Sequence, residues 1–423
     1  MLFQAPFTCD CWTKEFYSLS EDGKTLAAVI NGFKVEIHDA STGNSIITLR
    51  CIDKIDKVLW SPNGRHLAVA MYERNTVHIF TPSQSSQPYM RIDGGELGIE
   101  NIMWSPNNRY LLVFGKDGVR IDVWELRKSM NQLICLLNVK DSRKGVSFSP
   151  DKNFFAYLTR IEGSDCISIF SSEDWRPIDT IKINTLDACE IQWSPNSQYI
   201  AISDCQIEHR AIIVNLETQN CSEFQAYKEG VGISCMRWCF NSCLLAIGSG
   251  NDSIYILYAP DWKLLAEFNH INITRKEIAD HYIENTPGEM IKSDFPIEVR
   301  NYENSGITKI EWSNSGKYVA STSAAIPQTV FIWDIESLSL IHVFSFLTEV
   351  TDMKWSPTDD NLALGYGTDM MLNWKPNGFN VSHSQEAAIR IHFIEWKPDG
   401  ELLIVFDCIA GTCTFAHVLH DNE

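Results

Sequence analysis

The stretch KVLWSPNGRHLAVA, from Lys57 to Ala70, decides the fold, because it places a tight turn between two short apolar runs. Apolar and polar residues alternate up to Trp60, which is the pattern of a half-buried strand. The Ser-Pro-Asn-Gly that follows predicts a turn, since proline fixes φ and glycine tolerates a positive φ. A second strand is expected from His66 onward.

This hairpin is one copy of a repeat that runs along the whole chain. A weaker first copy has Leu19 in the aromatic position. The other copies have their aromatic residue at Trp60, Trp104, Phe148, Trp193, Trp238, Trp312, Trp355 and Trp396. Successive copies are about 43 residues apart, which is the length of one four-stranded propeller blade. One interval, from Trp238 to Trp312, is about 30 residues longer.

Third and fourth strands follow in each copy. The third strand ends about 20 residues after the aromatic residue, where a WD repeat carries its Trp-Asp dipeptide. Only Trp333-Asp334 keeps this dipeptide, and pairs such as His38-Asp39 and Trp124-Glu125 replace it in other copies. Segments such as SIITL and KLLAEF supply the fourth strand.

Nine copies predict an all-β WD-type propeller, with residues 1–423 forming one nine-bladed ring. The last copy lacks a strand, and the segment from Leu2 to Thr8 is expected to complete it and close the ring. The alternative is a ring of seven or eight blades with irregular terminal repeats.

Residues 269–305 form an insertion between the sixth and seventh repeats. The stretch RKEIADHYIE within it has a composition that fits a single helix. Long insertions of this kind are either functional or disordered, and we keep both alternatives.

The formal charge of −19 and the pI near 5.0 argue against the basic surface that nucleic-acid binding requires, and no basic run appears. Neither a signal peptide nor an apolar run of membrane-spanning length is evident, so we expect a soluble intracellular protein. The 13 cysteines include no CxxC pair, and Cys235, Cys239 and Cys243 fall on a predicted strand, turn and strand. We therefore expect no metal site and no cofactor.

The sequence contains none of the common catalytic or nucleotide-binding motifs. No nucleotide-binding, HExxH or GxSxG motif occurs, so catalysis has no positive support. Five Ser-Pro pairs could be kinase sites, but their common place in the repeat favours a role in the turn. Their serines are Ser61, Ser105, Ser149, Ser194 and Ser356.

Aromatic residues outside the repeat pattern are the candidates for protein interaction. Trp175 and Trp262 occupy matching positions between a third and a fourth strand. Each could anchor an interface or fold back over its own hairpin. The insertion adds His281, Tyr282, Phe295 and Tyr302 as further candidates.

Several segments resemble a specific family. CIDKIDKVLW, HLAVAMYERNTVHIF, QAYKEGVGIS and IPQTVFIWDIESLSL are similar to segments of the WRAP-type WD-repeat proteins of centrosomes and spindle poles. The resemblance covers nearly the whole chain, including the place of the insertion, although the insertion itself and the turn at WCFNS depart from the family pattern.

The resemblance implies a non-enzymatic scaffold in the cytoplasm and cytoskeleton, at the microtubule-organising centre. It implies binding to a coiled-coil spindle-pole adaptor of the Msd or SSX-two-interacting type. In fungi a minus-end-directed kinesin joins that pair and helps to anchor microtubule minus ends. The family offers no catalytic residues to transfer to this chain.

Two other classes of function remain as alternatives. A ribosome-associated translation-factor propeller shares the many WSP-type turns, but it would be expected to carry basic loops. An enzyme with its site on the propeller axis would bring ionisable groups from successive blades together, with shifted pKa values.

Overall fold

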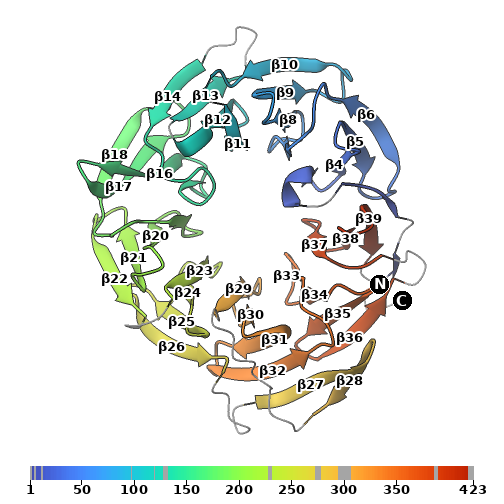
Figure 1. Cartoon of the computed structure of the whole chain (residues 1–423). Coiled ribbons are helices and arrows are strands. Elements are labelled where there is room, and N and C mark those ends of the chain that lie inside the picture. Colours follow the sequence, from blue (N-terminus) through green and yellow to red (C-terminus); the bar gives the residue numbers. More distant parts are fainter. Residues whose placement is uncertain are drawn as a thin grey trace.

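The computed structural model describes residues 2–3, 6–10, 13–96, 98–118, 120–126, 132–226, 231–271, 278–293, 306–384 and 389–417. Nine sheets, antiparallel except for one parallel strand pair, stand side by side in a ring around a central axis (Figure 1). The first strand of each blade lies nearest the axis and the fourth lies at the rim. The predicted nine-bladed propeller is therefore confirmed.

The elements of blades 1 to 5 have the following bounds. A short 3-10 helix, η1 (Lys14–Phe16), precedes blade 1, and η2 (Lys116–Gly118) lies within blade 3. Blade 1 contains β3 (Tyr17–Leu19), β4 (Thr25–Ile30), β5 (Lys34–Asp39) and β6 (Ser45–Arg50). Blade 2 contains β7 (Lys57–Trp60), β8 (Leu67–Met71), β9 (Thr76–Phe80) and β10 (Pro88–Asp93). Blade 3 contains β11 (Ile99–Trp104), β12 (Tyr110–Gly115), β13 (Arg120–Glu125) and β14 (Gln132–Leu137). Blade 4 contains β15 (Val146–Phe148), β16 (Phe154–Ile161), β17 (Ser164–Ser171) and β18 (Pro177–Lys182). Blade 5 contains β19 (Glu190–Trp193), β20 (Tyr199–Ser203), β21 (Arg210–Asn215) and β22 (Cys221–Gln225).

The remaining four blades complete the ring. Blade 6 contains β23 (Ile233–Trp238), β24 (Leu244–Ser249), β25 (Ser253–Tyr258) and β26 (Lys263–Asn269). Blade 7 contains β29 (Ile307–Trp312), β30 (Tyr318–Ser323), β31 (Ile326–Asp334) and β32 (Ser339–Ser345), joined by β27 (Ile278–Thr286) and β28 (Glu289–Lys292). Blade 8 contains β33 (Asp352–Trp355), β34 (Leu362–Gly365), β35 (Met370–Lys375) and β36 (Gly378–His383). Blade 9 contains β37 (Phe393–Trp396), β38 (Leu402–Asp407) and β39 (Thr412–His417), with β1 (Leu2–Phe3) and β2 (Phe7–Thr8).

The N-terminal segment closes the ring. Both β1 and β2 pair antiparallel with β39, so the first residues of the chain supply the outer strand that blade 9 lacks. The two ends of the described chain consequently lie side by side (Figure 1). This confirms the predicted closure, which leaves blade 9 without an unpaired third strand.

The recurring tryptophan that ends most first strands connects neighbouring blades. Among the described residues, six of these indole N–H groups donate to a carbonyl oxygen on the first strand of the preceding blade. The pairs are Trp104 with Leu59, Trp193 with Ser147, Trp238 with Gln192, Trp312 with Arg237, Trp355 with Glu311 and Trp396 with Lys354, at 3.0 to 3.3 Å. The apolar ring packs between the sheets while its N–H stays paired, which explains why the repeat favours tryptophan here.

The serine of the Ser-Pro pairs holds the turn after the first strand. Ser61 is fully buried, and its hydroxyl accepts the backbone N–H of His66 at 2.9 Å and donates to the side-chain oxygen of Asn63 at 2.8 Å. Ser105, Ser149 and Ser194 repeat this arrangement. The structural interpretation of the Ser-Pro pairs is thus favoured over a kinase site.

The insertion is not helical in the part that the structure describes, so the predicted helix over RKEIADHYIE is wrong from Ile278 onward. Strand β27 pairs in parallel with the outer strand of blade 7, from Ile278 opposite Leu340 to Ile283 opposite Ser345. Strand β28 then returns antiparallel to β27, which makes blade 7 six-stranded (Figure 1). The unpaired rim of β32 offers backbone partners to the segment, and this tertiary pairing overrides a weak helical preference.

Candidate functional site

The two tryptophans predicted as interface anchors or hairpin covers are both buried. Trp175 is 1% exposed and lies edge-on to Tyr110 of the preceding blade, with ring centroids 5.8 Å apart. Trp262 is 5% exposed and lies edge-on to Tyr199 at 5.0 Å and Trp238 at 5.2 Å. Neither presents an aromatic face to solvent, which favours the alternative that each folds back onto the propeller.

The candidates from the insertion also face inward where they are described. His281 is buried and its Nε2 lies 3.1 Å from the hydroxyl of Ser345. Tyr282 stacks on Phe344 at 5.5 Å and meets Phe379 of blade 8 edge-on at 4.7 Å. The hairpin therefore packs over the junction of blades 7 and 8. Phe295 and Tyr302 lie outside the described residues.

Ionisable side chains from three successive blades meet on the innermost strands, as an axial site would require. The carboxylate of Asp352 is buried in blade 8 and contacts Lys309 of blade 7. It accepts the backbone N–H of Ile394 in blade 9 at 3.0 Å and lies 3.8 Å from the ammonium group of Lys14 in η1. Four parts of the chain are thus joined through one carboxylate.

Burial shifts the pKa of two members of this axial cluster. Burial lowers the pKa of Lys309, although Asp352 and Glu311 oppose the shift. Burial raises the pKa of Glu395 on β37 above its usual range, against the pull of Lys354 and Lys14. Because Asp352 is saturated by lysines and backbone N–H groups, the cluster acts first as a clamp between blades 7, 8 and 9.

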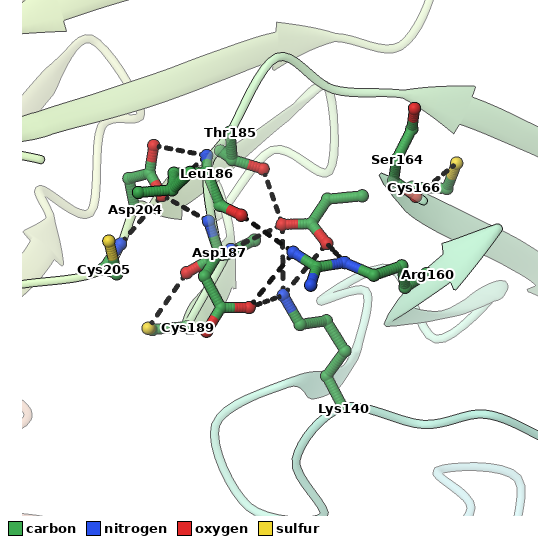
Figure 2. Close-up of polar contacts among 12 residues, drawn as sticks. Lys140, Arg160, Ser164, Cys166, Thr185, Leu186, Asp187, Cys189, Asp204 and Cys205 are labelled. Atoms are coloured by element: carbon green, nitrogen blue, oxygen red, sulfur yellow. Dashed lines mark hydrogen bonds and ion pairs between the residues drawn. The ribbon is translucent and has the colours of Figure 1, made fainter. Parts of the chain in front are cut away.

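A second polar cluster holds the crossing from blade 4 to blade 5 (Figure 2). Asp165 follows the turn between β16 and β17, and its side chain is fully buried. It pairs with Lys140 at 3.0 Å and with Arg160 at 2.9 Å, and it accepts the hydroxyl of Thr185 at 2.9 Å and the backbone N–H of Ala188 at 2.7 Å. Burial alone would raise the pKa of Asp165, but these donors lower it below the ordinary value.

The same loop is held from the other side by Asp204 of blade 5. Its carboxylate accepts the backbone N–H groups of Leu186 at 3.1 Å and Asp187 at 2.9 Å, and it pairs with Arg210 at 2.9 Å. Figure 2 shows Leu186 and Asp187 between Asp204 on one side and Arg160 and Lys140 on the other. Two buried acids therefore fix the backbone of this loop, whose apolar side chain, Leu186, is exposed.

Exposed apolar side chains line up along this face of the ring. We call it the B–C face, because it carries the turns between second and third strands and the crossings between blades. Four consecutive loops of blades 4 to 6 present the apolar row, consisting of Ile161, Leu186, Ile207 and Val231, which are 44%, 56%, 77% and 42% exposed. Hydrogen bonds from Arg160 to Leu186 O and from Gly232 to Gln206 O connect these loops. Apolar side chains gathered on one face are typical of a protein-interaction surface.

Sequence reasoning did not find the apolar row, because its members lie in loops about 20 residues apart and follow no motif. The available signal was a single aliphatic residue in each of several polar loops, such as Ile207 in DCQIEHR. The buried acids were equally hidden, because Asp165 lies at the start of a third strand and Asp204 just after a second strand, with no shared motif.

The cysteine segment forms strand, turn and strand as predicted, with Cys235 on β23, Cys239 in the turn and Cys243 before β24. Within the described ranges, no three side chains of metal-binding type converge. In the same parts of the chain, no helix has the length and apolar character needed to cross a membrane.

Comparison with known proteins agrees with the architecture. No family model matches the chain. The chain is 27% identical over 420 residues to the mouse WD repeat-containing protein WRAP73, covering 91% of this chain and 90% of that protein. It is 22% identical over 452 residues to the uncharacterized WD repeat-containing protein C32H8.09 of Schizosaccharomyces pombe, covering 96% and 89% of the two chains.

Among solved structures, the chain is similar in fold to dihydro-heme d1 dehydrogenase NirN, with a TM-score of 0.51 and 13% identity. That match covers 78% of this chain and 65% of the other, and at this identity it concerns the fold alone. With its ring of WD-type repeats, the chain is similar over nearly its whole length to WRAP-type WD-repeat proteins.

Proposed function

We propose that this protein is a non-catalytic interaction scaffold at the microtubule-organising centre. In this proposal it binds a coiled-coil adaptor of the Msd or SSX-two-interacting type, and in fungi it acts together with a minus-end-directed kinesin. The similarity to WD-repeat proteins supports the scaffold role in general. The location and the partners rest on the family resemblance of the sequence segments alone.

One observation carries the proposal. The apolar row lies on loops whose backbone is fixed by buried carboxylates. An amphipathic helix, such as one strand of a coiled coil, presents an apolar stripe that could lie along Leu186 and Ile207. The buried carboxylates of Asp165 and Asp204 fix the loop backbone in advance, which lowers the entropy cost of binding.

The test compares matched substitutions on the two faces of the ring. Ile207→Asp places a charge in the apolar row, whereas Phe240→Asp places one on a 60% exposed residue in the turn between β23 and β24. Tagged variants are expressed in dividing cells and crosslinked in mitosis, and captured proteins are identified by mass spectrometry. We expect wild type and Phe240→Asp to capture a coiled-coil protein of the spindle pole. Ile207→Asp should capture at least tenfold less of that protein.

The location is read from the same cells by microscopy against a spindle-pole marker. A wild-type protein that stays diffuse through mitosis and captures no spindle-pole component would overturn the proposal. Equal capture by wild type and Ile207→Asp, with correct localisation, would move the binding surface away from the apolar row.

A further inference from the structure

Stacked aromatic pairs recur where neighbouring blades meet, on the face opposite the apolar row. We call this the A–B face, because it carries the turns between first and second and between third and fourth strands. Each pair joins a residue at the start of a second strand to the aromatic residue that ends the first strand of the next blade. Tyr199 stacks on Trp238 at 6.4 Å, and Tyr318 stacks on Trp355 at 6.4 Å.

A third aromatic ring covers each of these two pairs edge-on. Trp262 lies 5.0 and 5.2 Å from the first pair, with interplanar angles of 79° and 85°. Trp374 lies 5.2 and 5.6 Å from the second pair, with angles of 76° and 89°. Trp175 takes the same edge-on position over Tyr110 and Phe148, between blades 3 and 4. An indole is therefore the preferred cover of such a pair in this molecule.

The pair between blades 4 and 5 lacks this cover. Phe154 stacks on Trp193 at 6.3 Å with an interplanar angle of 11°, and no third ring of the described residues contacts either of them. In its place is an open cavity of about 360 Å³. Ile169, Ile178 and Leu216 contribute to its apolar lining.

The sequence of one turn explains why no third ring covers Phe154 and Trp193. Trp175 and Trp262 stand at the same position of the turn between third and fourth strands, with φ of 57° and 52°. The corresponding residue of blade 5 is Gln219, with φ of 57°. Its amide donates to the carboxylate of Asp179 on blade 4 at 2.6 Å, so the side chain of this turn also reaches toward the preceding blade. A polar residue thus replaces the covering ring.

We propose that this cavity binds an indole or other large aromatic side chain supplied by a partner protein, flanked by lysine or arginine. Glu217 is the charged residue that lines the cavity, and Asp179 lies beside Ile178 on β18. An acidic rim on a chain of net charge −19 complements a basic flanking residue. The site goes beyond the proposed scaffold function, since it lies on the other face and names a different ligand chemistry.

The probe is the tripeptide acetyl-Lys-Trp-Lys-amide, with acetyl-Lys-Ala-Lys-amide as the control, titrated into the full chain by calorimetry. We expect the tryptophan probe to bind with a Kd below about 1 mM, consistent with burial of one ring. The alanine probe should bind at least tenfold more weakly. Equal binding of the two probes, or none, would overturn the inference.

Gln219→Trp tests the geometry, because it restores the residue found at this turn in blades 4 and 6. It should raise Tm by about 2 °C through burial of the new ring and weaken probe binding at least tenfold. Leu338→Trp is the matched control, since Leu338 has φ of 51° at the same turn position of blade 7. Probe binding that survives Gln219→Trp would overturn the inference.

The two proposals fail in different ways. Loss of spindle-pole capture by the wild-type chain, with intact probe binding, removes the proposed function and leaves the aromatic site. Capture of the adaptor without binding of the tryptophan probe removes the aromatic site alone.

Discussion

The crossing from blade 6 to blade 7 and the crossing from blade 4 to blade 5 are both held by buried side-chain contacts, but the contacts differ in chemistry. In the first, the indole N–H of Trp333 donates to Ser321 at 3.1 Å, and the buried His270 lies 2.8 Å from the same hydroxyl. In the second, the buried Asp165 holds two cations and the loop backbone. The contacts of Trp333, Ser321 and His270 join uncharged side chains and are buried, with the buried carboxylate of Asp252 accepting the backbone N–H of Gly306 beside them. The contacts of Asp165 are ionic and partly open to water.

The difference explains where the Trp-Asp dipeptide persists. Blade 7 keeps Trp333-Asp334 because Trp333 donates to a buried hydroxyl that His270 also contacts. Blade 4 has Phe170-Ser171 at the same place, so no indole N–H is available and ionic contacts fix the loop instead. In blade 7 the tryptophan of the dipeptide therefore has a hydrogen-bonding role as well as a packing role.

The largest effect is expected at the charged crossing. Asp165→Asn leaves Lys140 and Arg160 without their buried carboxylate and should lower the free energy of unfolding by about 3 to 5 kcal/mol. Asp187→Asn, at a carboxylate that is 55% exposed, should cost less than about 0.5 kcal/mol. Urea unfolding followed by circular dichroism measures both, and equal costs would show that burial of Asp165 does not matter.

The crossing from blade 6 to blade 7 should respond to pH. Burial lowers the pKa of His270 to about 4, from an ordinary value of 6.5. Because the unfolded chain takes up the proton more readily, this histidine favours folding above pH 6.5 and progressively loses that contribution between pH 6.5 and 4. The loss approaches about 3 kcal/mol at the lower end.

Unfolding measured from pH 7.5 to 4 checks this expectation. His270→Asn should flatten the decline of stability between pH 6.5 and 4. An identical pH profile in wild type and His270→Asn would contradict the assignment.

The smallest of the three effects is expected from the indole N–H itself. Trp333→Phe removes the donor to Ser321 and should cost about 1 to 2 kcal/mol. Trp124→Phe is the matched control in blade 3, because the buried Nε1 of Trp124 has no hydrogen-bond partner among the described residues. A larger cost at Trp124 than at Trp333 would mean that ring packing, not the hydrogen bond, preserves the dipeptide.

Local sequence was sufficient to predict the hairpins and their number. Ser61 and Trp60 act within one turn and one strand, so their roles repeat wherever the pattern repeats. The insertion was less predictable, since β27 gains its backbone partners from β32, more than 50 residues further along the chain. A segment whose hydrogen bonds come from a distant strand carries little local signal.

The candidate sites were the least predictable. Trp175 and Trp262 drew attention as large aromatic residues, yet the structure buries both. The open cavity lies instead where Gln219 interrupts their pattern, and a glutamine in a turn gives no indication of a missing ring. Only the alignment of equivalent turns in three dimensions reveals it.

The sequence by itself determined the blade, the number of blades and the strand that closes the ring, because hairpins depend on alternation and turn chemistry within about 43 residues. Tertiary structure alone decided which surfaces remain open. Buried Asp165 and Asp204 fix the backbone of the loop that exposes Leu186, and the absence of an indole leaves Phe154 and Trp193 uncovered. Both outcomes depend on contacts between blades, which periodicity along the chain does not encode.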